Sequence, residues 1–297
     1  KKDSLPKNIK AFDFFFDEEH NVQHRVQQEI ISEGIDNLFV VNAYRPLETY
    51  VLSLMNPRRT QRHLIQDGAL FYNKIEKSVF LNHTKNVFHV YKGLWKKKIW
   101  FTDLLYYGRY MEHSGYIDQV WMTNPEQYVG PALKKKVNVL TLFPNPDSIP
   151  TYSTYFGLSD EILEGLQDCL LYLPVFVKTE DKVQDEINCI KRIVKKLGKQ
   201  KVFIKLHPNA FDYQLKAMKE AFGSLVFKNN VAAEIYIANA RNSHIVACAS
   251  TSLFFYNPSC KYFALKRFYQ DLGIYSSWYN IHLPPHVNVV DSDQEIF

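Results

Sequence analysis

The sequence predicts an α/β fold made of two doubly wound domains, and three observations lead to this prediction. The chain has 297 residues, about twice the length of a common single domain. Strand-like apolar runs alternate with helical runs along most of it, which is the pattern of parallel βαβ units. A proline-rich segment near the middle interrupts the alternation. We therefore expect one α/β domain on each side of that segment.

The N-terminal half alternates strand-like and helical runs as far as an Asp-Gly pair at Asp67 and Gly68. Short runs rich in β-branched and aromatic residues favour strands, whereas apolar residues at steps of three and four favour helices. Helices are expected over residues 22–32 and 100–110, and residues 47–54 continue the alternation. The expected strands cover residues 12–16, 38–42, 63–65, 79–81, 87–90, 119–123 and 137–142.

The break in the pattern begins near Pro144, where three prolines occur within seven residues. Proline lacks the backbone N–H and fixes φ, so a continuing helix or a central strand is not expected there. We place a linker over residues 143–159. The chain is predicted to have an N-terminal domain of residues 1–155 and a C-terminal domain of residues 156–297.

After the linker the α/β rhythm begins again. Strands are expected over residues 170–177, 201–206, 225–228 and 245–249. Helices are expected over residues 182–197, 211–222 and 232–239, with a further helix from Leu253. The first of these helices has apolar residues at helical spacing and Gly198 at the C-cap position. The second half is therefore also expected to be doubly wound.

The composition indicates a folded protein and excludes some functions. Hydrophobic residues make up 46% of the chain and aromatic residues 15%, which is too apolar for a disordered chain. The net charge of +5 is too small for a dedicated nucleic-acid binder but is compatible with an acidic substrate or a membrane surface. Lysine runs at residues 96–98 and 134–136 either line a groove for an acidic acceptor or are solvated surface.

Cysteine usage and hydropathy bear on the compartment. The four cysteines show no CxxC spacing, and at least three lie in apolar runs, where a free cysteine behaves as a small buried hydrophobe. This favours a reducing compartment. No apolar run reaches the roughly 20 residues of a membrane span. We expect a cytoplasmic protein, with peripheral contact to the inner face of the cytoplasmic membrane compatible with the sequence.

The first polar cluster follows the expected strand over residues 201–206. In open parallel sheets, ligands bind outside the carboxyl ends of the strands. Lys205 and His207 can both contact phosphate oxygens, and Pro208 makes the strand exit rigid. This context favours a functional His207. Structural roles are expected for His24, His83, His89, His113, His244, His282 and His286.

The second polar cluster follows the expected strand over residues 245–249 and consists of Ser250, Thr251 and Ser252. Alone, it is best explained as a helix N-cap. Together with His207, on what we expect to be a neighbouring strand end, the hydroxyls and the first helix N–H groups indicate a phosphate site.

Two carboxylates are candidates for the remaining chemistry. Glu234 precedes the second cluster and can accept hydrogen bonds from ribose hydroxyls, or it is a solvated helix carboxylate. Asp67 stands before Gly68, which permits a sharp turn that exposes the carboxylate as an acid/base group. An Asp-Gly pair is also an ordinary turn.

The ordered set of motifs resembles a group of bacterial enzymes. Asp67-Gly68, the Lys205-Leu206-His207-Pro208 segment, Glu234 and Ser250-Thr251-Ser252 are similar to the acidic-Asp-Gly, HP and Ser/Thr motifs of bacterial sialyltransferases. The group includes lipooligosaccharide sialyltransferases of glycosyltransferase family 52 and capsule polysialyltransferases. The resemblance extends over about residues 64–255.

The resemblance implies a GT-B fold, in which two Rossmann-like domains face a cleft and the C-terminal one holds CMP-sialic acid without a metal or other cofactor. It implies an inverting transfer to lipooligosaccharide or capsular polysaccharide. Asp67 would deprotonate the acceptor hydroxyl, and His207 would stabilise or protonate the leaving CMP phosphate. The hydroxyls of residues 250–252 would share that phosphate, with Gly68, Lys205, Pro208 and Glu234 completing the site.

The sequence departs from the family pattern at Gln66, where a second acidic residue is usual. Only two α/β units precede Asp67, so the usual first strand is expected to be altered or absent. Two alternatives stay open. One is a GT-B transferase that uses a Kdo or polyol-phosphate donor, and the other is a nucleotide-sugar-binding subunit without turnover.

Overall fold

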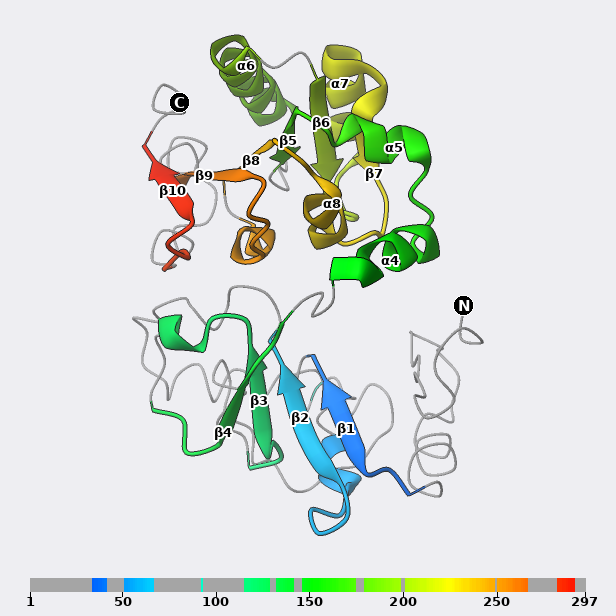
Figure 1. The fold of residues 1–297 in the computed structure, drawn as a ribbon, viewed down its shortest axis with the longest axis vertical. Coiled ribbons are helices and arrows are strands. Elements are labelled where there is room, and N and C mark those ends of the chain that lie inside the picture. Colours follow the sequence, from blue (N-terminus) through cyan, green and yellow to red (C-terminus); the bar gives the residue numbers. More distant parts are fainter. Residues whose placement is uncertain are drawn as a thin grey trace. The chain divides into compact units, whose positions relative to one another are not determined.

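The computed structural model describes ten segments of the chain: residues 34–41, 51–66, 92, 115–128, 132–141, 146–174, 179–198, 201–248, 250–266 and 282–291. The chain divides into two compact units. Each contains a sheet with parallel strands (Figure 1). The predicted α/β class is therefore confirmed. The predicted boundary between residues 155 and 156 stays a prediction.

The first unit is built around a sheet in the order β1-β2-β3-β4. Its strands are β1 (Asn37–Val40), β2 (Gln61–Ile65), β3 (Gln119–Met122) and β4 (Lys136–Val139). A 3₁₀ turn, η5 (Pro125–Gln127), follows β3. The pairs β1·β2 and β2·β3 are parallel. Four of the seven expected strands in this half are thus confirmed, while those over residues 12–16, 79–81 and 87–90 lie outside the described residues.

One face of this sheet is apolar and buried. Leu64, Val120 and Met122 are fully buried, as the period of two in a strand requires when one face meets a core. Residues 51–54 are helical, and Val51 and Leu52 from this turn are buried as well. Burial of this face fixes the register, because a slip by one residue would expose the whole apolar set.

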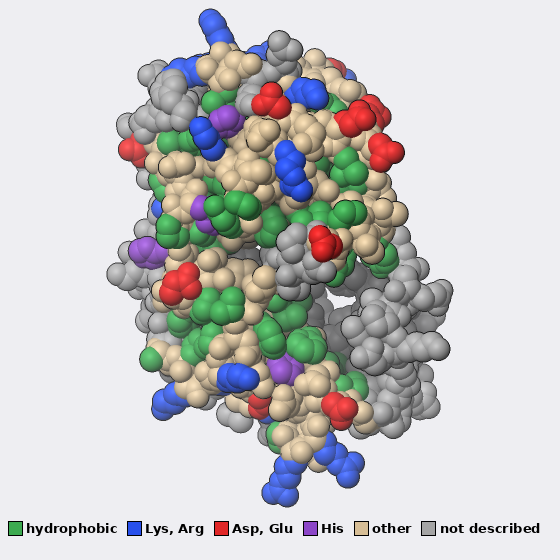
Figure 2. Space-filling model, in the orientation of Figure 1, with side chains coloured by type: hydrophobic (Ala, Val, Ile, Leu, Met, Phe, Trp, Pro, Cys, Tyr) green, Lys and Arg blue, Asp and Glu red, His purple; other side chains and the backbone are tan. Residues whose placement is uncertain are grey.

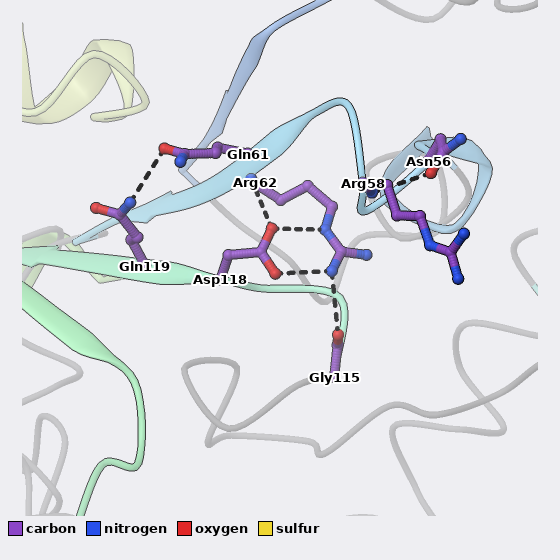
Figure 3. A network of polar contacts seen from close by, with 7 residues as sticks. All are labelled: Asn56, Arg58, Gln61, Arg62, Gly115, Asp118 and Gln119. Carbon is purple, nitrogen blue, oxygen red and sulfur yellow. Dashed lines mark hydrogen bonds and ion pairs between the residues drawn. The ribbon is translucent and has the colours of Figure 1, made fainter.

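An arginine fork joins the amino ends of β2 and β3 (Figure 3). Arg62 donates from Nε and Nη2 to the two carboxylate oxygens of Asp118, at 2.9 and 2.8 Å. The backbone N–H of Arg62 donates to the same carboxylate at 2.9 Å, and Nη2 also approaches the Gly115 carbonyl. Gln119 and Gln61 pair beside it at 3.1 Å. The fork pairs the charge of Arg62, which is almost completely buried.

His63, on the other face of β2, has a structural environment. Trp121 donates from Nε1 to its Nδ1 at 3.2 Å, so its Nε2 carries the proton and donates to Asn37 Oδ1 at 3.0 Å. Its ring stacks on Phe39 with the ring centroids 4.5 Å apart. Burial lowers the pKa of His63, with a smaller opposing effect from the Asp118 charge. Because both ring nitrogens of His63 are engaged in hydrogen bonds within the protein, we assign this side chain a structural role.

The second unit contains a six-stranded sheet and its helices. The strands are β5 (Cys169–Leu173), β6 (Lys201–Leu206), β7 (Val226–Lys228), β8 (His244–Ala247), β9 (Lys261–Leu265) and β10 (Val287–Val290). The α-helices are α4 (Ile149–Tyr155), α5 (Asp160–Gly165), α6 (Glu180–Leu197), α7 (Asp212–Phe222) and α8 (Ala233–Asn239). Its described residues also include the 3₁₀ turns η6 (Pro146–Ser148), η7 (Gly223–Leu225) and η8 (Thr251–Phe254).

The strand order of this sheet is β10-β9-β8-β5-β6-β7, and every neighbouring pair is parallel. The chain moves outward from β5 through β6 to β7, then returns to the other side of β5 for β8, β9 and β10. Counted from β5, this is the 3-2-1-4-5-6 order of dinucleotide-binding folds. The order reverses between β5 and β8, which makes their carboxyl ends the topological switch point.

An apolar core lies on each face of the sheet. Leu170 and Tyr172 of β5 pack in the core that α6 and α7 cover. Cys169, Leu171 and Leu173 pack in the core beneath α8. All five residues of β5 are buried, as expected for a central parallel strand with helices on both sides.

Helix α6 has the sequence features from which a helix is predicted. Acidic residues occupy its first turn and Lys195 and Lys196 its last, which complements the helix dipole. Val183, Ile187 and Ile190 form its buried stripe. Gly198 adopts the left-handed C-cap conformation, with φ 60°. The predicted helix and its predicted end are both confirmed.

Two sequence predictions about this unit are wrong. Helix α4 lies inside the predicted linker, because Pro150 sits in the first turn, where its missing N–H has no partner to lose. Helix α5 also begins at the edge of that segment. The predicted helix from Leu253 is instead the 3₁₀ turn η8, which ends at Phe254. Strands β9 and β10 had no sequence prediction.

Cysteine burial and helix hydropathy complete the description. Cys169, Cys189 and Cys248 are free and buried, as predicted, and Cys260 is partly buried. Across the ranges that the structure describes, no helix has both the length and the apolar character to cross a bilayer. The helix expected over residues 22–32 and the Tyr-rich helix over residues 100–110 lie outside those ranges.

The Arg62–Asp118 fork generates a stability prediction. Partial burial raises the pKa of Asp118, but the hydrogen bonds and charge of Arg62 outweigh it, so the pKa lies below its ordinary value of 3.8. Asp118→Asn should lower the free energy of unfolding by roughly 1–2 kcal/mol at pH 7, discounted because Asp118 is 35% exposed. The loss should shrink as the pH falls below 3.8, where wild type also loses the pair.

Urea unfolding of both proteins at pH 7 and pH 3 measures this difference. Asp36→Asn, a substitution at an exposed aspartate just before β1, is the control and should change little. Equal stability of Asp118→Asn and Asp36→Asn at pH 7 would contradict the role given to the fork.

Candidate functional site

Two of the predicted polar clusters lie at the carboxyl edge of the second sheet. Lys205 is the penultimate residue of β6, and His207 follows the strand directly. Ser250 follows β8 by three residues. The prediction that these strands are neighbours is wrong, because β5 lies between β6 and β8. Two strand spacings of about 4.8 Å separate the exits by about 10 Å, on either side of the switch point.

His207 is exposed at the strand exit, and one hydrogen bond fixes its tautomer. The Asn209 backbone N–H donates to His207 Nδ1 at 3.1 Å, so Nε2 carries the proton of the neutral ring. Partial burial and the nearby Lys205 charge lower the pKa of His207. The side chain is therefore a neutral hydrogen-bond donor at pH 7. Pro208, next to it, is exposed.

Lys205 is buried, with a relative exposure of 4%. Its Nζ donates to the carbonyl of Leu206 at 2.7 Å and to that of Asn229 at 3.1 Å, and lies 5.8 Å from the Tyr236 ring centroid. Burial lowers the pKa of Lys205 to about 8, although the Glu234 charge opposes this effect. The ammonium is thus charged at pH 7 while held inside the protein.

Asn229 and Tyr236 carry no prediction from the sequence, yet they connect Lys205 to α8. Asn229 follows β7 at the same carboxyl edge and donates from Nδ2 to Tyr236 Oη at 2.7 Å. Its Oδ1 accepts from the Val231 N–H at 3.2 Å. The rule that finds His207, a polar residue just after a strand of a parallel sheet, also applies to Asn229.

The hydroxyl cluster does not begin a regular helix. Ser250 caps η8 by accepting from the Ser252 N–H at 3.2 Å, so the N-capping interpretation of Ser250 is the one that the structure shows. The Ser252 side chain is buried and donates to Glu234 Oε1 at 2.8 Å. Within the described part of the chain, no hydrogen bond involves the Thr251 hydroxyl, which is partly exposed. The three hydroxyls thus have three different environments.

Glu234 connects the two clusters. It lies in the first turn of α8 and is partly buried. One carboxylate oxygen accepts from Ser252, beyond β8, while the charge acts on Lys205, at the end of β6. The alternative of a merely solvated helix carboxylate does not fit the Ser252 contact. The carboxylate is thus hydrogen-bonded to the cluster after β8 and acts on Lys205 through its charge alone.

Further contacts hold η8 against its neighbours. His286 donates from Nε2 to the Leu253 carbonyl at 2.9 Å, which supports the structural role predicted for it. Asn257 donates from Nδ2 to the carbonyls of Ile237 and Ala240, at 2.7 and 2.9 Å. These bonds tie the segment after β8 to the end of α8.

The predicted base lies outside the described residues. Gln66, immediately after β2, donates its backbone N–H to the Trp121 carbonyl at 2.9 Å. Asp67 and Gly68 come next in the chain, and the structure does not describe them. The role of Asp67 therefore stays a prediction.

On the one face that Figure 2 draws, basic side chains do not form a single continuous patch. On the face drawn in Figure 2, Lys and Arg side chains are interspersed with Asp and Glu. Lys134 and Lys136 are exposed, and the Lys135 charge acts on Asp118. The run at residues 96–98 lies outside the described ranges. The choice between an acceptor groove and solvated surface stays open.

One comparison with known proteins gave a match. Residues 176–270 match the model of the alpha-2,8-polysialyltransferase (POLYST) family. The match covers about a third of the chain and includes Lys205, His207, Glu234 and the hydroxyl cluster. No curated protein sequence matches the chain. The similarity supports a glycosyltransferase of the sialyltransferase type, as the motifs predict, but not membership of glycosyltransferase family 52 or a lipooligosaccharide enzyme.

Burial of Lys205 predicts a particular pH dependence of stability. Its pKa falls from 10.5 to about 8 on folding, so the unfolded chain binds more protons between these values. The contribution of this residue to stability is therefore complete above pH 10.5 and is lost as the pH falls to about 8. Lys205→Met should remove this dependence.

Urea unfolding of wild type and Lys205→Met from pH 7 to pH 10.5 measures the effect. The free energy of unfolding of wild type should rise with pH relative to that of the variant. Lys201→Met, at the exposed start of the same strand, should run parallel to wild type. A constant difference between wild type and Lys205→Met across this range would show that Lys205 titrates normally.

Proposed function

We propose that the chain is an inverting sialyltransferase that transfers sialic acid from CMP-sialic acid to a bacterial surface glycan. One observation carries the proposal. The segment similar to the polysialyltransferase family contains the polar groups that lie on either side of the switch point of the second sheet, whose strand order is that of dinucleotide-binding folds. In this proposal the second unit holds the donor, and the two units are the domains of a GT-B enzyme.

The donor phosphate is proposed to bind between His207 and the hydroxyl cluster. His207 offers an Nε2–H because its Nδ1 accepts from Asn209. Thr251 offers a hydroxyl without another partner in the described structure, and Ser250 accepts from the Ser252 N–H, which leaves its own proton to donate. Negative charge develops on the CMP phosphate as the bond to sialic acid breaks, so donors aimed there stabilise the transition state.

A proton on His207 completes this step. The pKa of the ring is lowered in the free protein by burial and by Lys205. A phosphate beside it would favour the charged ring and raise the pKa again. The added proton binds Nδ1, so the hydrogen bond from the Asn209 N–H opens as the ring becomes charged. His207 can then donate a proton to the leaving phosphate, while Pro208 keeps the strand exit rigid.

Glu234 is proposed to hold the donor ribose. One of its carboxylate oxygens accepts from Ser252. The other can accept hydrogen bonds from ribose hydroxyls, and a carboxylate held from one side is already oriented for this contact. This assignment places ribose between the two strand exits.

Asp67 is the proposed base. In an inverting transfer, the acceptor hydroxyl attacks the anomeric carbon on the face opposite CMP and must lose its proton. A carboxylate after a strand, followed by Gly68, is suited to accept it. Gln66 leaves this carboxylate without the acidic neighbour usual in the family.

The acceptor is proposed to be an acidic, sialylated glycan of the capsular type. The polysialyltransferase similarity favours it over lipooligosaccharide. The exposed Lys134 and Lys136 are compatible with an acidic acceptor.

A donor and acceptor assay tests the function. With CMP-sialic acid and a sialylated oligosaccharide, wild type should release CMP and extend the acceptor. His207→Ala and Asp67→Asn should each lower kcat by about 10²–10⁴, the usual contribution of an acid or base. His282→Ala, a substitution at another exposed histidine, is the control and should keep wild-type activity.

Other results point to the alternatives. If the protein turned over CDP-glycerol or a Kdo donor but not CMP-sialic acid, the donor assigned to it would have to change accordingly. CMP binding without any transfer would indicate a non-catalytic subunit. Full activity in both His207→Ala and Asp67→Asn would remove both residue assignments.

Proton uptake on CMP binding tests the role of His207 separately. The ring is neutral when free and gains a proton beside phosphate, so wild type should take up protons on binding near pH 7. Calorimetry in buffers of different ionisation enthalpy measures this uptake. His207→Gln keeps a hydrogen-bond donor but cannot gain a proton, so the uptake should disappear. Undiminished uptake in the variant would exclude His207 as its source.

A further inference from the structure

We infer that Lys205 is a positioning residue of the donor site: its buried ammonium fixes the loop between β7 and α8, and this loop presents Glu234 to Ser252. The identity of the ligand, CMP, rests on the proposed function. The contacts of Lys205 inside the protein are observed in the structure and are independent of that proposal. This role differs from a direct contact between Lys205 and phosphate, which the sequence alone suggests.

The lysine head group ties two strand ends together. Its Nζ donates to the Leu206 carbonyl at the end of β6 and to the Asn229 carbonyl just after β7. With the side chain only 4% exposed, water cannot replace these acceptors easily. An ammonium has three N–H donors, so two of them are already directed at backbone oxygens.

Asn229 connects the Lys205 ammonium to helix α8. Its carbonyl accepts from Lys205, its Nδ2 donates to Tyr236 Oη and its Oδ1 accepts from the Val231 N–H. Three separate bonds therefore hold one loop residue. Tyr236 is fully buried, and its ring lies beside the ammonium. The loop is thus fixed from β6 and from inside the helix.

Helix α8 depends on this loop because it has little stability of its own. It is seven residues long, and its N-cap, Ala232, makes no side-chain capping bond. Such a short helix is marginal without tertiary contacts. Its first turn carries Glu234, the partner of Ser252. Loss of the loop contacts would therefore displace the carboxylate that organises the hydroxyl cluster.

The ammonium has one counter-charge nearby, while its burial disfavours the charged form. The buried ammonium lies near one carboxylate, Glu234, which opposes the lowering of its pKa, and near His207, whose own pKa the ammonium lowers. Leaving the two carbonyls without Lys205 would cost more than replacing a surface lysine, because buried acceptors would lose their partner.

Hydrogen exchange in the ligand-free protein tests the positioning role. In Lys205→Met, the amides of Val231 and Ser252 should exchange about tenfold faster than in wild type, because the bonds to Asn229 and Ser250 open more often. Lys201→Met changes the same residue type on the same strand and should leave both rates unchanged. Tyr236→Phe removes only the acceptor for Asn229 Nδ2 and should accelerate Val231, which keeps the test decisive if Lys205→Met does not fold.

Binding of CMP by the same variants completes the test. Lys205→Met and Tyr236→Phe should both weaken CMP binding, although Tyr236 has no cationic group to offer a phosphate. Weaker binding in Lys205→Met with unchanged exchange rates would identify a direct phosphate contact and overturn the inference. Unchanged exchange and unchanged binding would overturn it as well. If wild type binds no CMP, the proposed function fails, and the exchange rates alone decide the positioning role.

Discussion

The parallel register of β6, β5 and β8 is the constraint on which the candidate site depends. Because these three strands run in the same direction, the chain leaves all of them at one edge. The reversal of strand order after β7 places β8 on the far side of β5. His207 and Ser250, 43 residues apart in sequence, thereby flank one switch point, which is where open α/β sheets bind nucleotides.

Polar contacts in the second unit stabilise this edge from inside. Buried Lys205 joins β6 to the loop after β7, and Glu234 joins α8 to the turn after β8. A buried charge is costly unless its hydrogen bonds are satisfied, and here two backbone oxygens supply them. The chain retains a buried cation at this position, and its hydrogen bonds hold the loop between β7 and α8.

The sequence predicts the second sheet better than it predicts the connections. The bounds of β6 agree with the structure, because its apolar run starts after Gly198 and ends at His207. Helix α4 is not predicted, because the sequence pattern does not distinguish a proline in the first turn of a helix from a proline that breaks a helix. The order of strands in a sheet depends on tertiary packing. The sequence pattern therefore does not predict that β5 lies between the two clusters. In the candidate site, strand-end chemistry in the sequence is enough to place His207 and the hydroxyl cluster at one edge of the sheet, while their roles stay predictions. It does not reveal that Lys205 faces inward or that Ser252 is bound to Glu234, because both depend on packing beneath α8.

A crystal structure of the protein with a non-hydrolysable CMP-sialic acid analogue tests the central claim most directly. The account predicts the donor phosphate at the carboxyl ends of β5 and β8, within hydrogen-bond distance of His207 Nε2 and the Thr251 hydroxyl, with ribose at Glu234. A phosphate bound elsewhere, with these three side chains free of the ligand, would contradict it.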